Sequence, residues 1–65
     1  MNPLKEARRE KGLSQFESAK GIGISYSMLV KMENGSKSPS KKTMGKTAKF
    51  YGKTVDELFF TDFVH

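Results

Sequence analysis

Charged lysine side chains are concentrated in one segment of this 65-residue sequence. Between Ser36 and Lys53 there are six lysines and no acidic residue. The first 35 residues carry a net charge of only +2, whereas residues 54–65 carry three acids and no base. Such an uneven distribution favours a polyanionic partner for the basic segment. A solvated lysine face is the competing interpretation.

No set of side chains in the sequence is suited to catalysis. The single histidine, His65, is the last residue, there is no cysteine, and no pair of carboxylates is spaced for acid–base work. Without cysteine there is neither a disulfide framework nor a Cys/His metal site. We therefore expect a binding protein and not an enzyme, with no metal, no cofactor and no small-molecule ligand.

Helix start and stop signals divide the chain into five helix-length segments, and no segment alternates at period two. Each segment follows a residue that can cap a helix: Asn2, Ser14, Ser25, Ser40 and Thr54. A glycine stands at the end of four segments: Gly12, which is suited to a left-handed helix end, Gly23, Gly35 and Gly52. The sequence predicts an all-α domain over residues 1–65, with residues 60–65 forming a tail or a short strand.

The second and third segments are joined by a short turn that contains glycine. Ser14 and Glu17 have the spacing of a capping box, so a helix is predicted to about Lys20, with Gly21 and Gly23 ending it. Ser25 starts the next helix, which stops at the Asn-Gly pair at residues 34–35. Two helices joined in this way, over about residues 14–34, can present the second helix to a groove of DNA.

The size of the chain favours association with a second copy. A domain this short buries only about 60% of the surface that its unfolded chain exposes. Hydrophobic residues make up 35% of the sequence, and no disulfide can add stability. A homodimer is therefore expected. No apolar run approaches a membrane span, and the charged start is unlike a signal peptide, so a cytoplasmic location is expected.

The sequence resembles the Cro/C1-type helix-turn-helix regulators, or Xre family, of bacteria and phages. The resemblance runs from about Leu4 to Phe60. Its motifs are Leu13-Ser14-Gln15, Ala19, Ile22-Gly23-Ile24-Ser25, Leu29, Met32-Glu33-Asn34-Gly35, Pro39-Ser40, Ala48, Gly52 and Val55-Asp56-Glu57-Leu58-Phe59. It implies a compact five-helix, lambda-repressor-like domain. Such a domain binds a two-fold operator in double-stranded DNA as a dimer, with recognition helices in major grooves about 34 Å apart.

The helix after Ser25 is predicted to carry the base contacts. At 100° per residue, Met28, Leu29 and Met32 point inward, and a second group lies on or beside the opposite face. We call this group the recognition face; its members are Tyr26, Ser27, Val30 and Lys31. The resemblance implies base reading by Tyr26, Ser27 and Lys31, with Val30 alongside. Lys31 is suited to guanine and Val30 to a thymine methyl group.

Two regions are predicted to bind DNA phosphates. In the family the glutamine that matches Gln15, in the first turn of its helix, clamps a phosphate, where backbone N–H groups also attract anions. The second region is the loop and helix start after residue 36, and its candidates are Lys37, Ser38, Ser40, Lys41 and Lys42. The helix-capping Ser25 is a further candidate for phosphate binding. Lys46, Lys49 and Lys53 recur at helical spacing and are interpreted as mostly solvated.

The resemblance also assigns a structural role to two charged residues. In phage repressors the positions that match Arg8 and Glu33 form a partly buried ion pair between the first and third helices. We therefore expect this pair to orient the recognition helix.

Several residues depart from the family pattern. Ser18 stands where a buried leucine is usual, and Phe16 is apolar at an outward position. We expect Phe16 to lean over and cover the space left by Ser18. Gly21 is expected to weaken the second helix. Polar residues also replace usually apolar ones at three positions: Lys41, Thr47 and Lys53. The core is therefore expected to be thin.

The C-terminal end is more apolar than a chain end needs to be. Leu58 and Phe59 are expected to close the core, whereas Phe60, Phe63 and Val64 have no evident intramolecular role and are predicted to form the dimer contact. A loose tail folded back on the domain is the alternative.

Three functions remain open from the sequence. The first is a sequence-specific transcriptional regulator, expected to be a repressor. The second is a protein-interaction module, antitoxin-like or accessory, whose main partner is another polypeptide. The third is non-specific coating of nucleic acid through the lysines alone.

Overall fold

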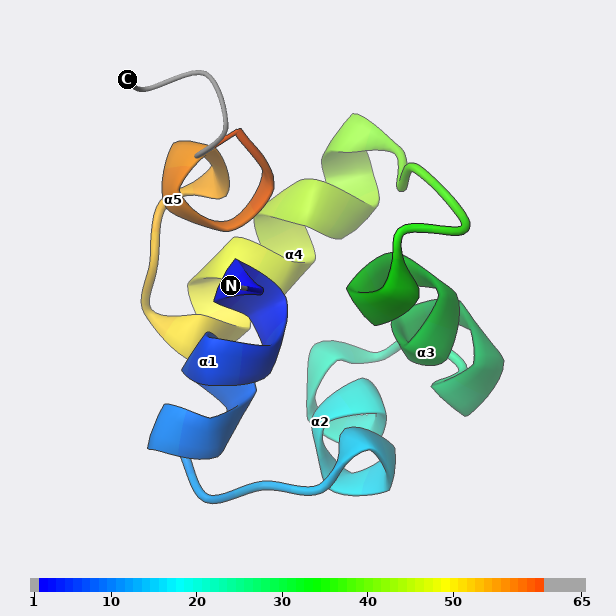
Figure 1. Cartoon of the computed structure of the whole chain (residues 1–65), viewed down its shortest axis with the longest axis vertical. Coiled ribbons are helices and arrows are strands. Elements are labelled where there is room, and N and C mark those ends of the chain that lie inside the picture. The colour runs from blue at the N-terminus through cyan, green and yellow to red at the C-terminus, as the bar shows by residue number, and fades with distance from the viewer. Residues whose placement is uncertain (1, 61–65) are drawn as a thin grey trace.

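Capping residues set where each helix begins in the computed structural model, which describes residues 2–60. The helices are α1 (Pro3–Glu10), α2 (Gln15–Ile22), α3 (Tyr26–Asn34), α4 (Lys41–Tyr51) and α5 (Val55–Phe59). Within the described residues there are helices and no strand, so the prediction of an all-α, five-helix domain is confirmed (Figure 1). Of the predicted tail or strand over residues 60–65, residues 61–65 lie outside the described residues.

The five predicted caps are all present. Each capping side chain accepts a hydrogen bond from a backbone N–H three residues later, and those of Ser14 and Thr54 belong to complete capping boxes. In the boxes, Glu17 and Glu57 accept from the backbone N–H of their caps at 2.9 Å. Because a cap satisfies a backbone donor that the helix leaves unpaired, each contributes about 1 kcal/mol.

The prediction that Gly21 ends the second helix is wrong. Helix α2 continues through Gly21 to Ile22, and Gly23, with φ +90°, is its C-cap. The ring of Phe50, from α4, lies so close to Gly21 that a Cβ atom there would overlap it. Gly21 therefore allows α4 to approach α2 closely, a role that only the folded structure reveals.

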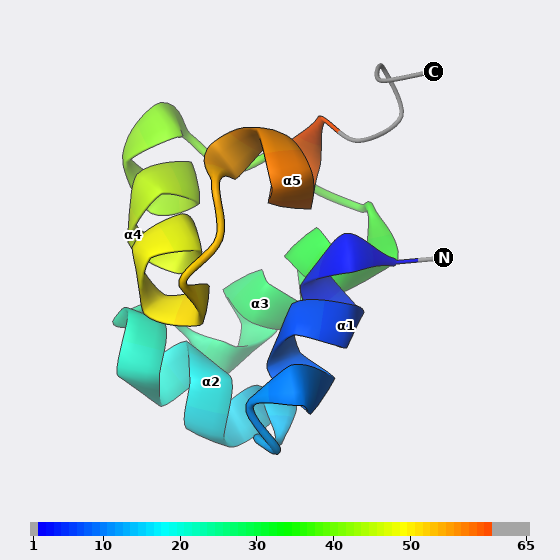
Figure 2. The ribbon, with the colours of Figure 1, turned by 90° about the vertical axis from the view of Figure 1, so that its left-hand side faces the viewer.

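All five helices contribute to one core. Helix α2 packs against α3 and α4, while α5 packs against α1 and α4. In Figure 2, α1 and α4 stand on opposite sides, with α5 above and α2 below. The buried apolar side chains are Leu4, Ala7, Ala19, Ile22, Leu29, Met32, Ala48, Tyr51 and Leu58. Leu58 is buried and Phe59 packs partly buried against this core, as expected of both.

Phe16 does not cover Ser18, contrary to the expectation. Phe16 is 66% exposed, whereas Ser18 is fully buried. The large ring of Tyr51 is buried from α4 instead. Burial raises the pKa of Tyr51, and the nearby Ser18 hydroxyl opposes that rise. Neither hydroxyl makes a hydrogen bond of standard geometry with another described residue.

The other polar substitutions in the predicted core have local explanations. Thr47 is fully buried, and its hydroxyl donates to the carbonyl of Thr43 at 2.8 Å. Lys53 forms an exposed ion pair with Glu10 at 3.2 Å, which links α1 to the segment between α4 and α5. Lys41 is exposed at the start of α4. The side chains at these positions therefore leave no unpaired charge in the core.

The capping boxes predict a weak loss of stability in acid. Hydrogen bonds from Ser14 and Thr54 lower the pKa of Glu17 and Glu57 below the ordinary value of 4.5. Because the folded-state pKa is lowered, this stabilisation is present above about pH 4.5 and is lost as the pH falls through the folded-state values. We expect a Glu17→Gln/Glu57→Gln variant, which keeps the caps but cannot titrate there, to show a flatter melting temperature between pH 5 and 3. An unchanged pH profile would contradict this assignment.

Candidate nucleic-acid interface

Helix α3 has one buried side and one exposed side, as the helical wheel predicts. Leu29 is fully buried and Met32 is 6% exposed, while Met28 packs partly buried against the core. On the other side Tyr26, Ser27 and Lys31 are exposed, and Val30 is half-buried. The four side chains of the recognition face are thus accessible from outside the domain.

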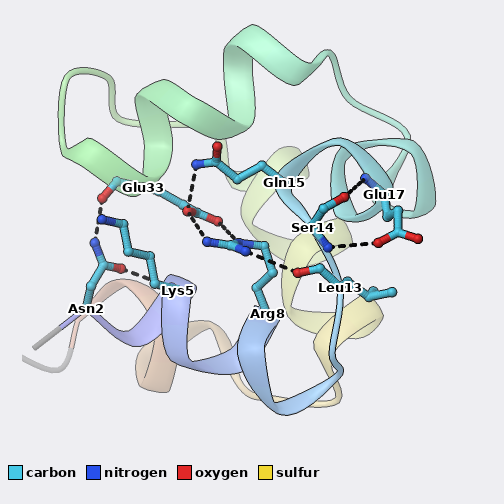
Figure 3. A network of polar contacts seen from close by, with 8 residues as sticks. All are labelled: Asn2, Lys5, Arg8, Leu13, Ser14, Gln15, Glu17 and Glu33. Atoms are coloured by element: carbon cyan, nitrogen blue, oxygen red, sulfur yellow. Dashed lines mark hydrogen bonds and ion pairs between the residues drawn. The ribbon is translucent and has the colours of Figure 1, made fainter.

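The orientation of α3 is fixed by a buried carboxylate. Glu33 is 3% exposed, and its Oε2 lies 2.8 Å from the Nε of Arg8, on α1. The Nη2 of Arg8 donates to the other oxygen of Glu33 at 3.2 Å, so the pair is bidentate (Figure 3). This hydrogen bonding to Glu33 raises the pKa of Arg8 further above its ordinary value. The structure therefore brings together the two residues predicted as an ion pair.

Two further contacts join this pair to the rest of the domain. The Nη1 of Arg8 donates to the carbonyl of Leu13 at 3.1 Å, at the start of the helix-turn-helix unit. The side chain of Asn2 donates to the backbone carbonyl of Glu33 and also caps α1 by accepting from the N–H of Lys5 (Figure 3). The N-terminal end of α1 is thus held on the last turn of α3, a contact that sequence reasoning missed.

Gln15 also contacts Glu33. Its Nε2 donates to Glu33 Oε1 at 3.0 Å, which links the first turn of α2 to α3 (Figure 3). An amide nitrogen carries two hydrogens, so Gln15 keeps one for another acceptor. Phosphate binding by Gln15 remains a prediction, now for a side chain that is already oriented by the protein.

The predicted phosphate-binding residues around α4 are all exposed: Lys37, Ser38, Ser40, Lys41 and Lys42. The hydroxyl of Ser40 caps α4, and that of Ser25 caps α3, so each already accepts one hydrogen bond. Of the lysines interpreted as solvated, Lys46 donates to the carbonyl of Gly23 at 3.4 Å. This contact places a positive charge at the C-terminal end of α2, where it is favourable.

Among the predicted dimer residues, Phe60 is 38% exposed at the end of α5. Phe63 and Val64 lie outside the described residues.

Comparison with known sequences decides the family. The sequence pattern described as Helix-turn-helix matches residues 4–58, which include α2 to α4 and most of α1 and α5. This chain belongs to the Cro/C1-type helix-turn-helix family. The family comprises transcriptional regulators, so the expectation that the chain is not an enzyme is confirmed.

Named relatives of this helix-turn-helix domain come from several sources. It is 40% identical over 85% of its length to the cryptic phage CTXphi transcriptional repressor RstR of Vibrio cholerae, of which it spans half. It is 36% identical to an uncharacterized HTH-type transcriptional regulator of Methanocaldococcus jannaschii, covering 89% of this chain and 88% of that protein. It is 37% identical to the ImmF control region 10 kDa protein of Bacillus phage phi105, covering 91% of this chain and 66% of that protein. No solved structure was found to match the chain.

Two kinds of site are absent from the described residues of this helix-turn-helix domain. No helix in residues 2–60 is long and apolar enough to cross a membrane. The same residues contain no group of three or more His, Cys, Asp or Glu side chains that could hold a metal ion.

Proposed function

We propose that this protein is a sequence-specific DNA-binding regulator, a repressor that binds a two-fold operator as a homodimer. In this proposal α3 enters the major groove and reads bases through Tyr26, Ser27, Val30 and Lys31. The observation that supports it most is that the recognition face is accessible on α3, while Glu33, in the last turn of that helix, is fixed to α1 and α2. A helix held at a defined angle can present its side chains to base edges reproducibly.

The charge distribution supports the same proposal. The exposed lysines of the loop after α3 and the start of α4 lie next in the chain to the recognition helix. Phosphate contacts from such residues fix the register of a protein on the duplex, while base contacts supply specificity. Two of the relatives named above come from phages, and one of these is named a transcriptional repressor.

Selection from a pool of random DNA with the purified protein tests the proposal. We expect an enriched inverted repeat whose half-site centres lie about 10 base pairs apart, because two recognition helices of one dimer face the same side of the duplex. An enriched site without two-fold symmetry would contradict the dimer. Absence of any enriched sequence would contradict specific binding.

Dimerisation is assigned in this proposal to Phe60, Phe63 and Val64. We expect deletion of the residues after Thr61 to convert a dimer into a monomer, as measured by sedimentation equilibrium, because the deletion removes two of the three apolar side chains. The double substitution Phe63→Ser/Val64→Ser in the full chain should have the same effect. If both variants remain dimeric, the C-terminal interface is wrong.

Phosphate binding is tested by the salt dependence of affinity. If Lys37 contacts a phosphate in each protomer, Lys37→Ala should weaken binding to all DNA sequences alike. It should also reduce the slope of log K against log salt by about 1 per contact removed. Lys49→Ala is the matched control, since Lys49 is exposed on α4 outside the proposed contact region. Equal slopes for the two variants would contradict a phosphate contact at Lys37.

A further inference from the structure

Two of the exposed large hydrophobic side chains lie against each other. Phe16, in the first turn of α2, is 66% exposed, and Tyr26, the first residue of α3, is 50% exposed. Their ring centroids are 6.5 Å apart, with a tilt of 48° between the planes. The two helices of the helix-turn-helix unit therefore share one exposed aromatic pair.

The pair has no role in the core that would explain its composition. Neither ring belongs to the core or to the side chains packed against it, and Phe16 is 66% exposed while Ser18, which it was expected to cover, is fully buried. A single exposed aromatic residue needs no explanation, but two in contact, at the ends of separate helices, indicate a surface that a partner covers.

The neighbours of the pair point to DNA as that partner. Phe16 follows Gln15, whose amide is held by Glu33 at 3.0 Å, and Tyr26 precedes Ser27 of the recognition face. The pair thus joins a residue next in the chain to the proposed phosphate contact with the first of the proposed base contacts. The adjacent acid, Glu17, accepts from the backbone N–H of Ser14 at 2.9 Å, so its carboxylate is engaged in the cap of α2.

We infer that Phe16 and Tyr26 together form a contact for the C5-methyl group of a thymine in each half-site. The inference rests on the proposed function and adds to it a residue outside α3. The thymine methyl is the apolar group that base edges offer in the major groove, and aromatic side chains can pack on it. Phe16 would then determine specificity at one position, in concert with Tyr26.

Substitution of uracil for thymine, which removes only this methyl group, tests the inference. Each thymine of the duplex enriched by selection is replaced in turn, and the affinity of the protein for both forms is measured. For the unmodified protein we expect, apart from any thymine contacted by Val30, one position per half-site at which uracil weakens binding by about fourfold, the effect of one buried methyl group. For Phe16→Ala and Tyr26→Ala the ratio at that position should fall to about 1. Phe16→Leu should restore part of it.

Unfolding does not confuse the result, because Phe16 is mostly exposed and its variants should melt like the parent protein. Tyr26→Phe keeps the ring and should keep the uracil effect, which separates the ring from the hydroxyl. If Phe16→Ala retained the uracil effect of the parent, or if no thymine showed one, the inference would be overturned. Failure of the proposed function is a different outcome, since selection would then enrich no sequence at all.

Discussion

Arg8→Ala is expected to lower the free energy of unfolding by about 3–5 kcal/mol, because it leaves a buried carboxylate without its cation. The side chain of Glu33 is 1% exposed, and after the substitution the amide of Gln15 would be its one remaining side-chain hydrogen-bond partner within residues 2–60. Such a loss is a large part of the 5–15 kcal/mol that stabilises a typical domain. Urea unfolding of the variant measures it, and the melting temperature should fall by more than about 10 °C.

Two variants separate the buried pair from a general effect of charge. Lys53→Ala removes the cation of the exposed pair with Glu10 and should change stability by less than about 1 kcal/mol. Arg8→Met/Glu33→Leu removes both buried charges and should recover much of the stability lost in Arg8→Ala. The double variant should nevertheless bind DNA less tightly, since α3 loses the side-chain hydrogen bonds that link it to Arg8 and Gln15. Equal melting temperatures for Arg8→Ala and the parent would contradict the account.

Lys31→Ala is expected to weaken binding to the selected operator by at least about 30-fold while changing affinity for random DNA much less. A specific base contact is worth about 1–3 kcal/mol of discrimination, and a dimer loses two of them. Lys31 is exposed at the edge of the recognition face, whereas Leu29 and Met32 are buried. Competition binding at one salt concentration measures both affinities.

Repeating the selection with the Lys31→Ala protein gives the control. The variant should lose its preference at one base pair of each half-site and retain the others, because Tyr26, Ser27 and Val30 are unchanged. A uniform loss of affinity with an unaltered sequence preference would show that Lys31 contacts phosphate and not a base.

Local signals in the sequence were sufficient to predict where the helices begin. Ser14 with Glu17 forms a capping box within four residues, so nothing beyond the segment is needed to recognise it. The inward face of α3 follows in the same way from the spacing of Leu29 and Met32. The structure confirms these predictions because backbone hydrogen bonding and helical periodicity act over short distances.

Contacts between distant segments could not be predicted from such signals. From the sequence alone, Gly21 indicates a helix end. Its actual role depends on the ring of Phe50, which is 29 residues later in the chain and lies against it in the structure. The prediction that Phe16 covers Ser18 failed for the same reason, since the aromatic residue that Phe16 contacts is Tyr26, on the next helix. Of the network around Glu33, the resemblance supplied Arg8, but the hydrogen bonds of Asn2 and Gln15 emerged only from the packing of the helices.

The central claim is that α3 recognises a DNA sequence, and the ratio of two dissociation constants tests it most directly. The intact protein is titrated at about 0.15 M salt with the duplex enriched by selection and with a scrambled duplex of the same composition. We predict that the selected duplex binds about a thousandfold more tightly or better, as is typical of specific regulators. A ratio below about tenfold would contradict the claim and would indicate binding through the lysines alone.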